Sequence, residues 1–314
     1  MSEEPAPLEA GIARYAATLR DAMQGKPLPT SPEERRRVFA LRATRFRLPI
    51  PEGVEIVDHH ICAPGREIPF RLYRPKTAAP PPLVLYLHGG GWVCGDVSTH
   101  ESVTAPLAAG SGVAVASLHY RRAPENPFPA AFEDASFALR WLIRQAGAFG
   151  LDAGRIAVAG DSAGGNLAAA LAIEAREQGD VALKAQILLY PVVDDDVERP
   201  SYRADRDPFL TRAGMIYYLE SYFAQGHGRD DPLGLPLRCR NLGGLPPAYI
   251  LAADNDPLRD EALDYAARLE AAGVPTTLRL VPGTIHGFLR AQPVSALARA
   301  EMALLGNVTR ALLA

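Results

Sequence analysis

The sequence predicts an α/β fold with a mostly parallel central sheet and helices on both of its faces. Two runs, Leu83–Leu87 and Val113–Leu118, are apolar throughout, as expected of parallel strands that are buried on both sides. From residue 131 onward, strand-length apolar runs alternate with helical patterns, which is typical of parallel sheets covered by helices. The motif Gly160-Asp161-Ser162-Ala163-Gly164 stands at one of the predicted strand-to-helix turns.

Composition and charge narrow the class of protein. With 314 residues, 48% hydrophobic and 22% charged, the chain can form one α/β domain with an appended element. A net charge of −3 gives no electrostatic reason to expect nucleic acid or an anionic membrane as partner. No run reaches the roughly 18 apolar residues of a membrane span, so we expect no stable membrane insertion. Residues 1–5 lack the basic-then-apolar order of a secretory signal, and the three cysteines have no paired spacing. We therefore expect a cytoplasmic protein.

Two helices are predicted ahead of the first strand. Residues 7–24 carry apolar side chains at spacings of three and four, namely Leu8, Ile12, Tyr15, Leu19 and Met23. Gly25–Pro29 breaks this helix, and Ser31-Pro32-Glu33-Glu34 predicts a capping box that opens a second one. Its run Arg35-Arg36-Arg37 is predicted to be a solvated face. We expect residues 1–50 to cover the sheet rather than join it.

The remaining elements follow in order. Val54–Cys62 and Ile68–Tyr73 predict an antiparallel hairpin around Ala63-Pro64-Gly65. After the two apolar strands, the pattern predicts helix 131–146, strand 155–159, helix 163–178, strand 184–190, strand 248–253, helix 258–272, strand 276–281 and a closing helix from about residue 293. Residues 194–245 interrupt the alternation and are predicted to be an insertion with one helix around Thr211–Phe223.

Ser162 is the candidate nucleophile. A residue held in a strained turn between strand and helix needs neighbours without side chains, and Gly160 and Gly164 flank the serine at the required spacing. The hydroxyl is thereby pushed into the open. The backbone N–H of Ala163 would point from a helix N-terminus toward an anion formed beside it. A plain glycine- and serine-rich helix start without chemistry is the alternative interpretation of this stretch.

A second glycine-rich stretch follows strand 83–87. In His88-Gly89-Gly90-Gly91-Trp92 no lysine follows as a phosphate loop would require, so we expect the N–H groups of Gly90 and Gly91 to bind an oxyanion together with Ala163. A plain turn is the alternative. His88 precedes the donors on the same strand end and is predicted to brace the loop rather than act as a base.

The acid and the base come after two later strands. Four acidic side chains compete in Asp254–Glu261, and Asp256 is the candidate because it stands at the strand exit before a helix-starting proline. Asp260 and Glu261 are predicted to interact with the helix dipole. His286 lies in a glycine-flanked loop after strand 276–281. The chain order Ser162, Asp256, His286, with each residue directly after its own strand, matches that of a known serine, acid and histidine triad.

These motifs together resemble the hormone-sensitive-lipase-like family of α/β-hydrolase carboxylesterases. The resemblance rests on His88–Trp92, Tyr120-Arg121-Arg122-Ala123-Pro124-Glu125, Gly160–Gly165, Asp256–Glu261 and His286-Gly287-Phe288, in this order. It implies an α/β-hydrolase fold over residues 51–314, with a cap made of residues 1–50 and the 194–245 insertion. It implies Ser162, Asp256 and His286 as catalytic residues and Gly90, Gly91 and Ala163 as the oxyanion hole. Arg122 departs from the family, which usually has leucine there.

The resemblance further implies a carboxylesterase for small esters with short to medium acyl chains, using neither cofactor nor metal. An amide or peptide hydrolase with the same triad, or a receptor that has lost catalysis, are the other interpretations. The oligomeric state is left open, with a homodimer as one possibility.

Three other features receive structural interpretations. Asp194-Asp195-Asp196 is predicted to be a solvated loop, and Cys94 a packed thiol. The aromatic residues of the insertion face either the cap's own core or the substrate, and the sequence does not decide between them; they are Tyr217, Tyr218, Tyr222 and Phe223.

Overall fold

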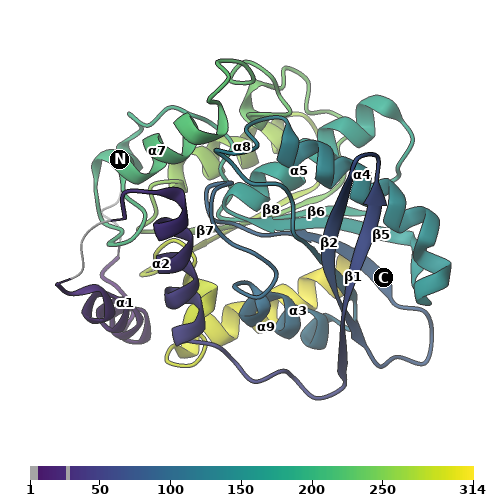
Figure 1. The fold of residues 1–314 in the computed structure, drawn as a ribbon, viewed down its shortest axis with the longest axis horizontal. Coiled ribbons are helices and arrows are strands. Elements are labelled where there is room, and N and C mark those ends of the chain that lie inside the picture. The colour runs from purple at the N-terminus through teal and green to yellow at the C-terminus, as the bar shows by residue number, and fades with distance from the viewer. Residues whose placement is uncertain (1–5, 26–28) are drawn as a thin grey trace.

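An eight-stranded sheet runs through the centre of the protein (Figure 1), whose computed structural model describes residues 6–25 and 29–314. The strands are β1 (Val54–Ala63), β2 (Arg66–Pro75), β3 (Pro82–Leu87), β4 (Ala114–Leu118), β5 (Asp152–Asp161), β6 (Ala185–Leu189), β7 (Ala248–Ala253) and β8 (Thr276–Val281). Their spatial order is β1-β2-β4-β3-β5-β6-β7-β8. Strand β2 is antiparallel to β1 and β4, and the other neighbouring pairs are parallel. The predicted mostly parallel sheet is confirmed.

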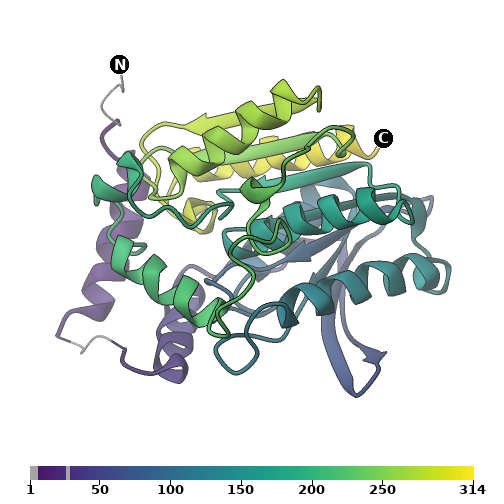
Figure 2. The same ribbon diagram turned by 90° about the horizontal axis from the view of Figure 1, so that it is seen from above.

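The helices form a layer on each face of the sheet and a third group beside one end of it (Figures 1 and 2). One face carries α4 (Ala130–Gln145), α5 (Ala163–Gln178) and α8 (Arg259–Ala271), and the other carries α3 (Glu101–Ser111) and α9 (Ala296–Leu312). The third group is α1 (Ala10–Met23), α2 (Pro32–Arg45) and α7 (Arg212–Tyr222). Shorter helical segments are α6 (Pro200–Arg203) and the 3₁₀ turns Ala146–Phe149, Pro236–Arg238 and Phe288–Ala291.

Strand β3 shows why the central runs are apolar throughout. Leu83, Leu85 and Leu87 pack against the layer of α4 and α5, whereas Val84 and Tyr86 pack against the layer of α3 and α9. All five side chains are fully buried. Because successive side chains point to opposite faces, a strand between two helical layers has no solvent-facing position for a polar residue.

Helix α3, between β3 and β4, was not predicted from the sequence. It contains Pro106 and ends with Gly110 and Ser111, residues of low helix propensity. Its formation depends on packing against α9, where Gly110 meets Gly306 so closely that a Cβ on Gly306 would lie 3.0 Å from the carbonyl carbon of Gly110. A parallel β3–β4 connection also requires a crossover of about this length.

The N-terminal helices were predicted, but the solvated face assigned to Arg35–Arg37 is wrong for two of the three residues. Arg36 donates hydrogen bonds to both carboxylate oxygens of Glu125, at 2.8 and 2.6 Å. Arg35 lies over the ring of Tyr217, 3.8 Å from its centroid. Arg37 is exposed, as predicted. These contacts attach α2 to the segment between β4 and α4, which carries Glu125, and to α7, which carries Tyr217.

The expected capping box at the start of α2 is confirmed, with Ser31 and Glu34 bonded reciprocally. The expected break between the two helices falls partly on residues 26–28, which lie outside the described residues, as do residues 1–5, on which the absence of a secretory signal was argued. In the part of the chain that the structure describes, we find no helix with both the length and the apolar character needed to cross a membrane.

The segment that leads into α1 is held by loops from the far end of the sequence. The backbone N–H of Ala6 donates to the carboxylate of Asp254 at 2.8 Å, and that of Glu9 donates to the carbonyl of Gly283 at 2.9 Å. The Glu9 carboxylate in turn accepts from the hydroxyl of Ser295 at 2.8 Å. The N-terminal helices are therefore attached to the loops that follow β7 and β8.

Candidate active site

The turn that carries Ser162 joins β5 to α5. Ser162 has φ 57° and ψ −121°, a conformation that side-chain-bearing residues rarely adopt. A Cβ on Gly164 would lie 1.9 Å from the carbonyl oxygen of Leu87, and one on Gly160 would lie 2.2 Å from the carbonyl oxygen of Gly164. The close approach that the glycine spacing predicts is thus present. Such strain, on the order of 1–3 kcal/mol, persists where the surrounding structure enforces it.

Asp256 and His286 meet beside this turn. Asp256 follows β7, His286 follows β8, and His286 Nδ1 lies 2.7 Å from Asp256 Oδ2. The other carboxylate oxygen accepts the backbone N–H of Leu258 at 2.9 Å, so the carboxylate is fixed. Burial alone would lower the pKa of His286, but the charge and hydrogen bond of Asp256 raise it above its usual value. With Nδ1–H donating to Asp256, Nε2 is free to accept a proton.

The three other acids of the Asp254–Glu261 stretch are engaged elsewhere. Asp254 accepts a backbone N–H from the N-terminal segment, and Asp260 accepts one from α6. Glu261 is fully buried and accepts the backbone N–H of Val193 at 3.0 Å. Glu261 lies in the first turn of α8, as the predicted interaction with the helix dipole requires, and it also anchors the start of the insertion. Of the four, it is Asp256 that contacts His286.

Gly90 and Gly91 line the same pocket as Ser162. Both have positive φ, 119° and 60°, and neither has room for a side chain. A Cβ on Gly91 would lie 2.2 Å from the ring of Tyr218, and one on Gly90 would lie 2.4 Å from the carbonyl oxygen of Cys94. Ala163, the third predicted donor, opens α5 directly after Ser162, so its N–H has no partner within the helix.

The glycine-rich loop that follows β3, residues 88–95, is called the glycine loop below. The contacts that hold it were only partly predicted. His88 is buried and stacked on Tyr120 with ring centroids 4.2 Å apart, which fits the predicted bracing role. Its Nδ1 lies 3.0 Å from the carbonyl oxygen of Gly89. The departure from the family pattern, Arg122, donates to the carbonyl of Gly95 at 2.9 Å and so holds the far end of the same loop.

Asp161, next to Ser162, was not predicted to belong to the site. Its carboxylate accepts the hydroxyl of Tyr86 at 2.8 Å and the backbone N–H of Gly89 at 3.0 Å, and it pairs with Arg290 at 3.2 Å. Burial would raise the pKa of Asp161, but His100 and Arg290 hold it well below its usual value. Asp161 therefore fixes the glycine loop against the serine turn. Its position inside the Gly-x-Ser-x-Gly motif is the sequence feature from which a role in the site could have been predicted.

Asp207, from the loop before α7, was also missed. One of its oxygens accepts the backbone N–H of His286 at 2.7 Å, and the other accepts those of Phe209 and Leu210. Burial and the nearby charge of Asp256 raise the pKa of Asp207 to about 6. The insertion thus supports the histidine loop directly, a contact between residues far apart in sequence that no local pattern reveals.

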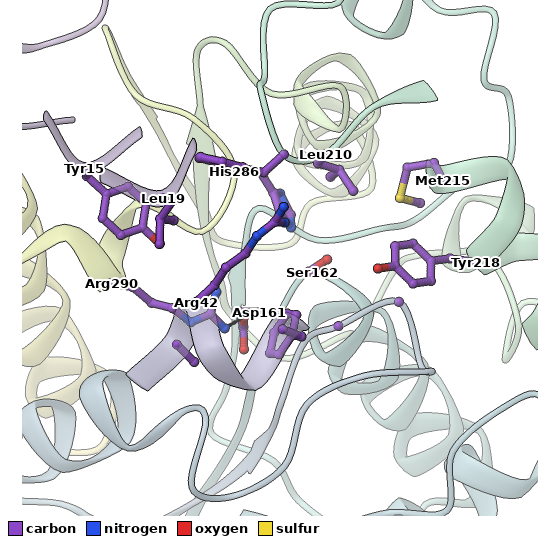
Figure 3. A pocket seen from close by; sticks show the side chains of 15 residues that line it. Tyr15, Leu19, Arg42, Asp161, Ser162, Leu210, Met215, Tyr218, His286 and Arg290 are labelled. Atoms are coloured by element: carbon purple, nitrogen blue, oxygen red, sulfur yellow. Dashed lines mark hydrogen bonds and ion pairs between the residues drawn. The ribbon is translucent and has the colours of Figure 1, made fainter. Parts of the chain in front are cut away.

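A pocket of about 110 Å³ opens above Ser162 (Figure 3). Its walls come from α1, α2, the glycine-rich loop after β3, the turn at Ser162, the insertion and the loop that carries His286. The lining residues are Tyr15, Leu19, Phe39, Arg42, Ala43, Gly90, Gly91, Asp161, Ser162, Phe209, Leu210, Met215, Tyr218, His286 and Arg290. Of the aromatic residues left undecided by the sequence, Tyr218 faces this pocket. Tyr222 instead stacks on Trp92 inside the core, with centroids 4.1 Å apart.

Two further interpretations can be judged. The solvated loop predicted for Asp194–Asp196 is wrong for Asp194, which is buried and pairs with Arg199 at 2.7 Å, and Asp195 pairs with Arg229 at 2.7 Å. Cys94 is a packed thiol as predicted, and burial raises its pKa to about 11. Within residues 6–25 and 29–314, no cluster of three or more acidic, histidine or cysteine side chains is arranged to hold a metal ion.

The raised pKa of His286 predicts a pH profile. As the predicted catalytic base, His286 must be neutral to accept a proton, so kcat/KM should fall about tenfold per pH unit below this pKa and level off above it. Because the pKa lies above the usual value of about 6.5, the rise should extend through neutrality, with the optimum on its alkaline side. Initial rates measured across this pH range at constant ionic strength test the prediction. Enzyme returned from each pH to pH 8 should recover its full activity, which excludes unfolding as the cause of a loss. A flat profile from pH 5 to 8 would contradict it.

The chain is similar to known proteins in both sequence and structure. Residues 84–290 match a family described as having the alpha/beta hydrolase fold. The chain is 41% identical over 248 residues to the esterase LipI of Mycobacterium tuberculosis, covering 77% of this chain and 78% of that protein. It is 40% identical over 231 residues to an ethyl acetate hydrolase of Pseudomonas putida, covering 72% and 73%. The crystal structure of a thermostable esterase from Pseudomonas putida superposes with a TM-score of 0.91 at 34% identity, covering 100% and 99%.

Proposed function

Because the chain belongs to the hormone-sensitive-lipase-like carboxylesterases of the α/β-hydrolase fold and is a carboxylic ester hydrolase, we propose that Ser162, His286 and Asp256 are its catalytic triad. The observation that carries the proposal is the 2.7 Å contact between His286 Nδ1 and Asp256 Oδ2, in a pocket that His286 shares with the strained Ser162. Relatives at about 40% identity are named esterases, which favours ester hydrolysis over amide cleavage or a receptor role.

Acylation begins when His286 Nε2 takes the proton of the Ser162 hydroxyl as its oxygen attacks the ester carbonyl carbon. Asp256 holds the imidazole in the required tautomer and stabilises the imidazolium that forms. The tetrahedral intermediate collapses as His286 gives its proton to the leaving alkoxide, which departs as an alcohol. Water then repeats the sequence on the acyl-enzyme, releasing the carboxylic acid and restoring the Ser162 hydroxyl.

The backbone N–H groups of Gly90, Gly91 and Ala163 stabilise the oxyanion of each tetrahedral intermediate. The dense packing around the two glycines supports this role, because donors that cannot relax away do not need to reorganise during the reaction. The bond from Gly89 N–H to Asp161 holds their loop in register with Ser162.

Residues 1–50 and the 194–245 insertion act together as a cap on the catalytic domain of residues 51–314. Support comes from the pocket lining, to which α1, α2 and α7 all contribute, and from contacts such as Arg35 over Tyr217. The apolar part of this lining, which includes Leu19, Leu210 and Met215, suits an acyl chain. The pocket's small volume supports a preference for short to medium chains.

A larger side chain in the pocket should reduce the length of the acyl chain that the enzyme accepts. Ala43 lines the pocket from α2, and Ala43→Leu should lower kcat/KM progressively for longer acyl groups while acetate esters are spared. Each methylene excluded is worth up to about 0.8 kcal/mol, or about fourfold. The measurement is kcat/KM for an acetyl-to-decanoyl series of 4-nitrophenyl esters.

The matched control is Ala40→Leu, on the same helix but outside the pocket lining. A point substitution is preferable to deleting the cap helices, because the segment before α1 also holds the loop that carries Asp256. If Ala43→Leu and wild type give parallel chain-length profiles, the acyl chain does not lie against α2.

A further inference from the structure

The side chain of Arg42 lines the active-site pocket without an anionic partner. It projects from α2 into the same pocket as Ser162 and His286 (Figure 3). Its Nε is buried and has no hydrogen-bond partner among the described residues, and no carboxylate of those residues lies within 4.0 Å of its guanidinium. The other guanidinium of the pocket, Arg290, is paired with Asp161 at 3.2 Å. Arg42 therefore brings to the site a positive charge that no ion pair among the described residues compensates.

The acids around Arg42 are already engaged. Asp207 accepts three backbone N–H groups, one of them from His286. Asp256 is bonded to the His286 imidazole, and Asp161 is bound by Arg290 and His100. Arg42 contacts an aromatic face instead, since its guanidinium carbon lies 5.0 Å from the ring centroid of Phe209. Among the described residues no carboxylate forms an ion pair with Arg42, and the more distant charge of Asp207 compensates it only in part.

Burial makes such a charge unfavourable. It lowers the pKa of Arg42, an effect that Tyr218, Tyr15 and Asp207 offset only in part. An arginine nevertheless stays protonated at neutral pH. Arg42 is half-buried, and its buried Nε lacks a partner, which carries a desolvation cost. A planar guanidinium can bind a carboxylate with two parallel hydrogen bonds. The arrangement is the one expected where the anion arrives with a ligand.

A second arginine, Arg35, lies near Arg42 in a pocket next to the active-site pocket. An adjoining pocket of about 360 Å³ shares Phe39, Arg42, Phe209 and Tyr218 with the active-site pocket and is also lined by Arg35. The Nε of Arg35 is likewise buried without a hydrogen-bond partner in the described part of the chain. A molecule that reaches Ser162 past α2 and α7 would thus meet two arginines along its path.

We propose that Arg42 binds a carboxylate of the substrate, so that the preferred esters carry a carboxylate a few atoms from the scissile carbonyl. Monoesters of dicarboxylic acids and O-acyl esters of hydroxy acids are the two forms of this class, with the charge on the acyl or the alcohol side. The inference rests on the proposed attack by Ser162, because it places the carboxylate relative to that reaction.

The test compares substrates that differ in charge but not in shape. On the acyl side, monoethyl glutarate is compared with its neutral isostere ethyl 4-carbamoylbutanoate, and on the alcohol side 3-acetoxypropanoate is compared with 3-acetoxypropanamide. We expect wild type to favour the carboxylate member of at least one pair by about tenfold in kcat/KM at low salt, a preference that shrinks as salt is raised. In Arg42→Gln this preference should disappear, and Arg42→Lys should retain part of it.

Arg45→Gln is the matched control, because Arg45 is exposed on the same helix and lies outside the pocket lining. It should keep the wild-type preference. Inhibition of neutral-ester turnover by glutarate but not by glutaramide is a second readout that needs no variant. The proposal is overturned if wild type shows no carboxylate preference in either pair, or if Arg42→Gln keeps it. A failed triad gives a different result, namely ethyl pentanoate turnover that survives Ser162→Ala.

Discussion

Ser162→Ala is expected to lower kcat by 10³-fold or more while the protein stays folded. The substitution removes one oxygen from a small side chain whose backbone is held by its neighbours, including the bond from Ser162 N–H to the carbonyl of Leu189 at 2.9 Å. Without the hydroxyl no acyl-enzyme can form, and only the oxyanion hole and substrate binding remain to accelerate attack by water.

The measurement is ester turnover together with covalent labelling by an organophosphonate, read out by peptide mass spectrometry. Wild type should be labelled once, on Ser162, and the alanine variant should not be labelled at that position. Ser98→Ala, at an exposed serine outside the pocket lining, should retain full activity. Retention of more than about a tenth of wild-type kcat by a folded Ser162→Ala protein would exclude Ser162 as nucleophile.

Asp256→Asn should lower kcat by about 10³- to 10⁴-fold, whereas Asp254→Asn should change it by no more than about threefold. The carboxylate of Asp256 accepts both His286 Nδ1–H and the backbone N–H of Leu258. An asparagine whose oxygen keeps the Leu258 bond turns its NH₂ toward Nδ1. The imidazole then adopts the tautomer with its proton on Nε2 and cannot accept the proton of Ser162.

Asp254→Asn serves as the matched control, since its oxygen can still accept the N–H of Ala6. Steady-state kinetics on one chromogenic ester, with circular dichroism to compare folding, distinguish the two variants. Equal losses from both changes would mean that the acid was assigned to the wrong residue.

The sheet and the chain order of the proposed triad could be predicted because both depend on short stretches of sequence. A strand covered on both faces reads as an apolar run, as in Leu83–Leu87, and the residues after consecutive parallel strands gather at one edge of the sheet. Helix α3 escaped prediction because its stability comes from packing against α9 rather than from its own residues. The assignment of the site residues themselves remains a prediction.

Contacts between distant residues account for what the sequence analysis missed. Asp207 reaches the His286 backbone across 79 residues, and Asp161 reaches Arg290 across 129. Arg35 and Arg36 look like a solvated run in sequence, yet one packs on Tyr217 and the other pairs with Glu125. A charged side chain is assigned to the surface by its type, and only the fold reveals which charges are drawn inward.

The attachment of residues 6–9 to the loops after β7 and β8 also bears on how the protein is made. Ala6 and Glu9 leave the ribosome before their partners Asp254 and Ser295, which follow 248 and 286 residues later. Contacts of such sequence separation close the longest loops of the chain and so form late in folding. Tyr15 and Leu19 of α1 are buried in a cluster that includes Ile285 and Phe288, so this apolar face stays uncovered until those residues have been made. The pocket cannot be complete before His286 and Arg290, which line it, have been made.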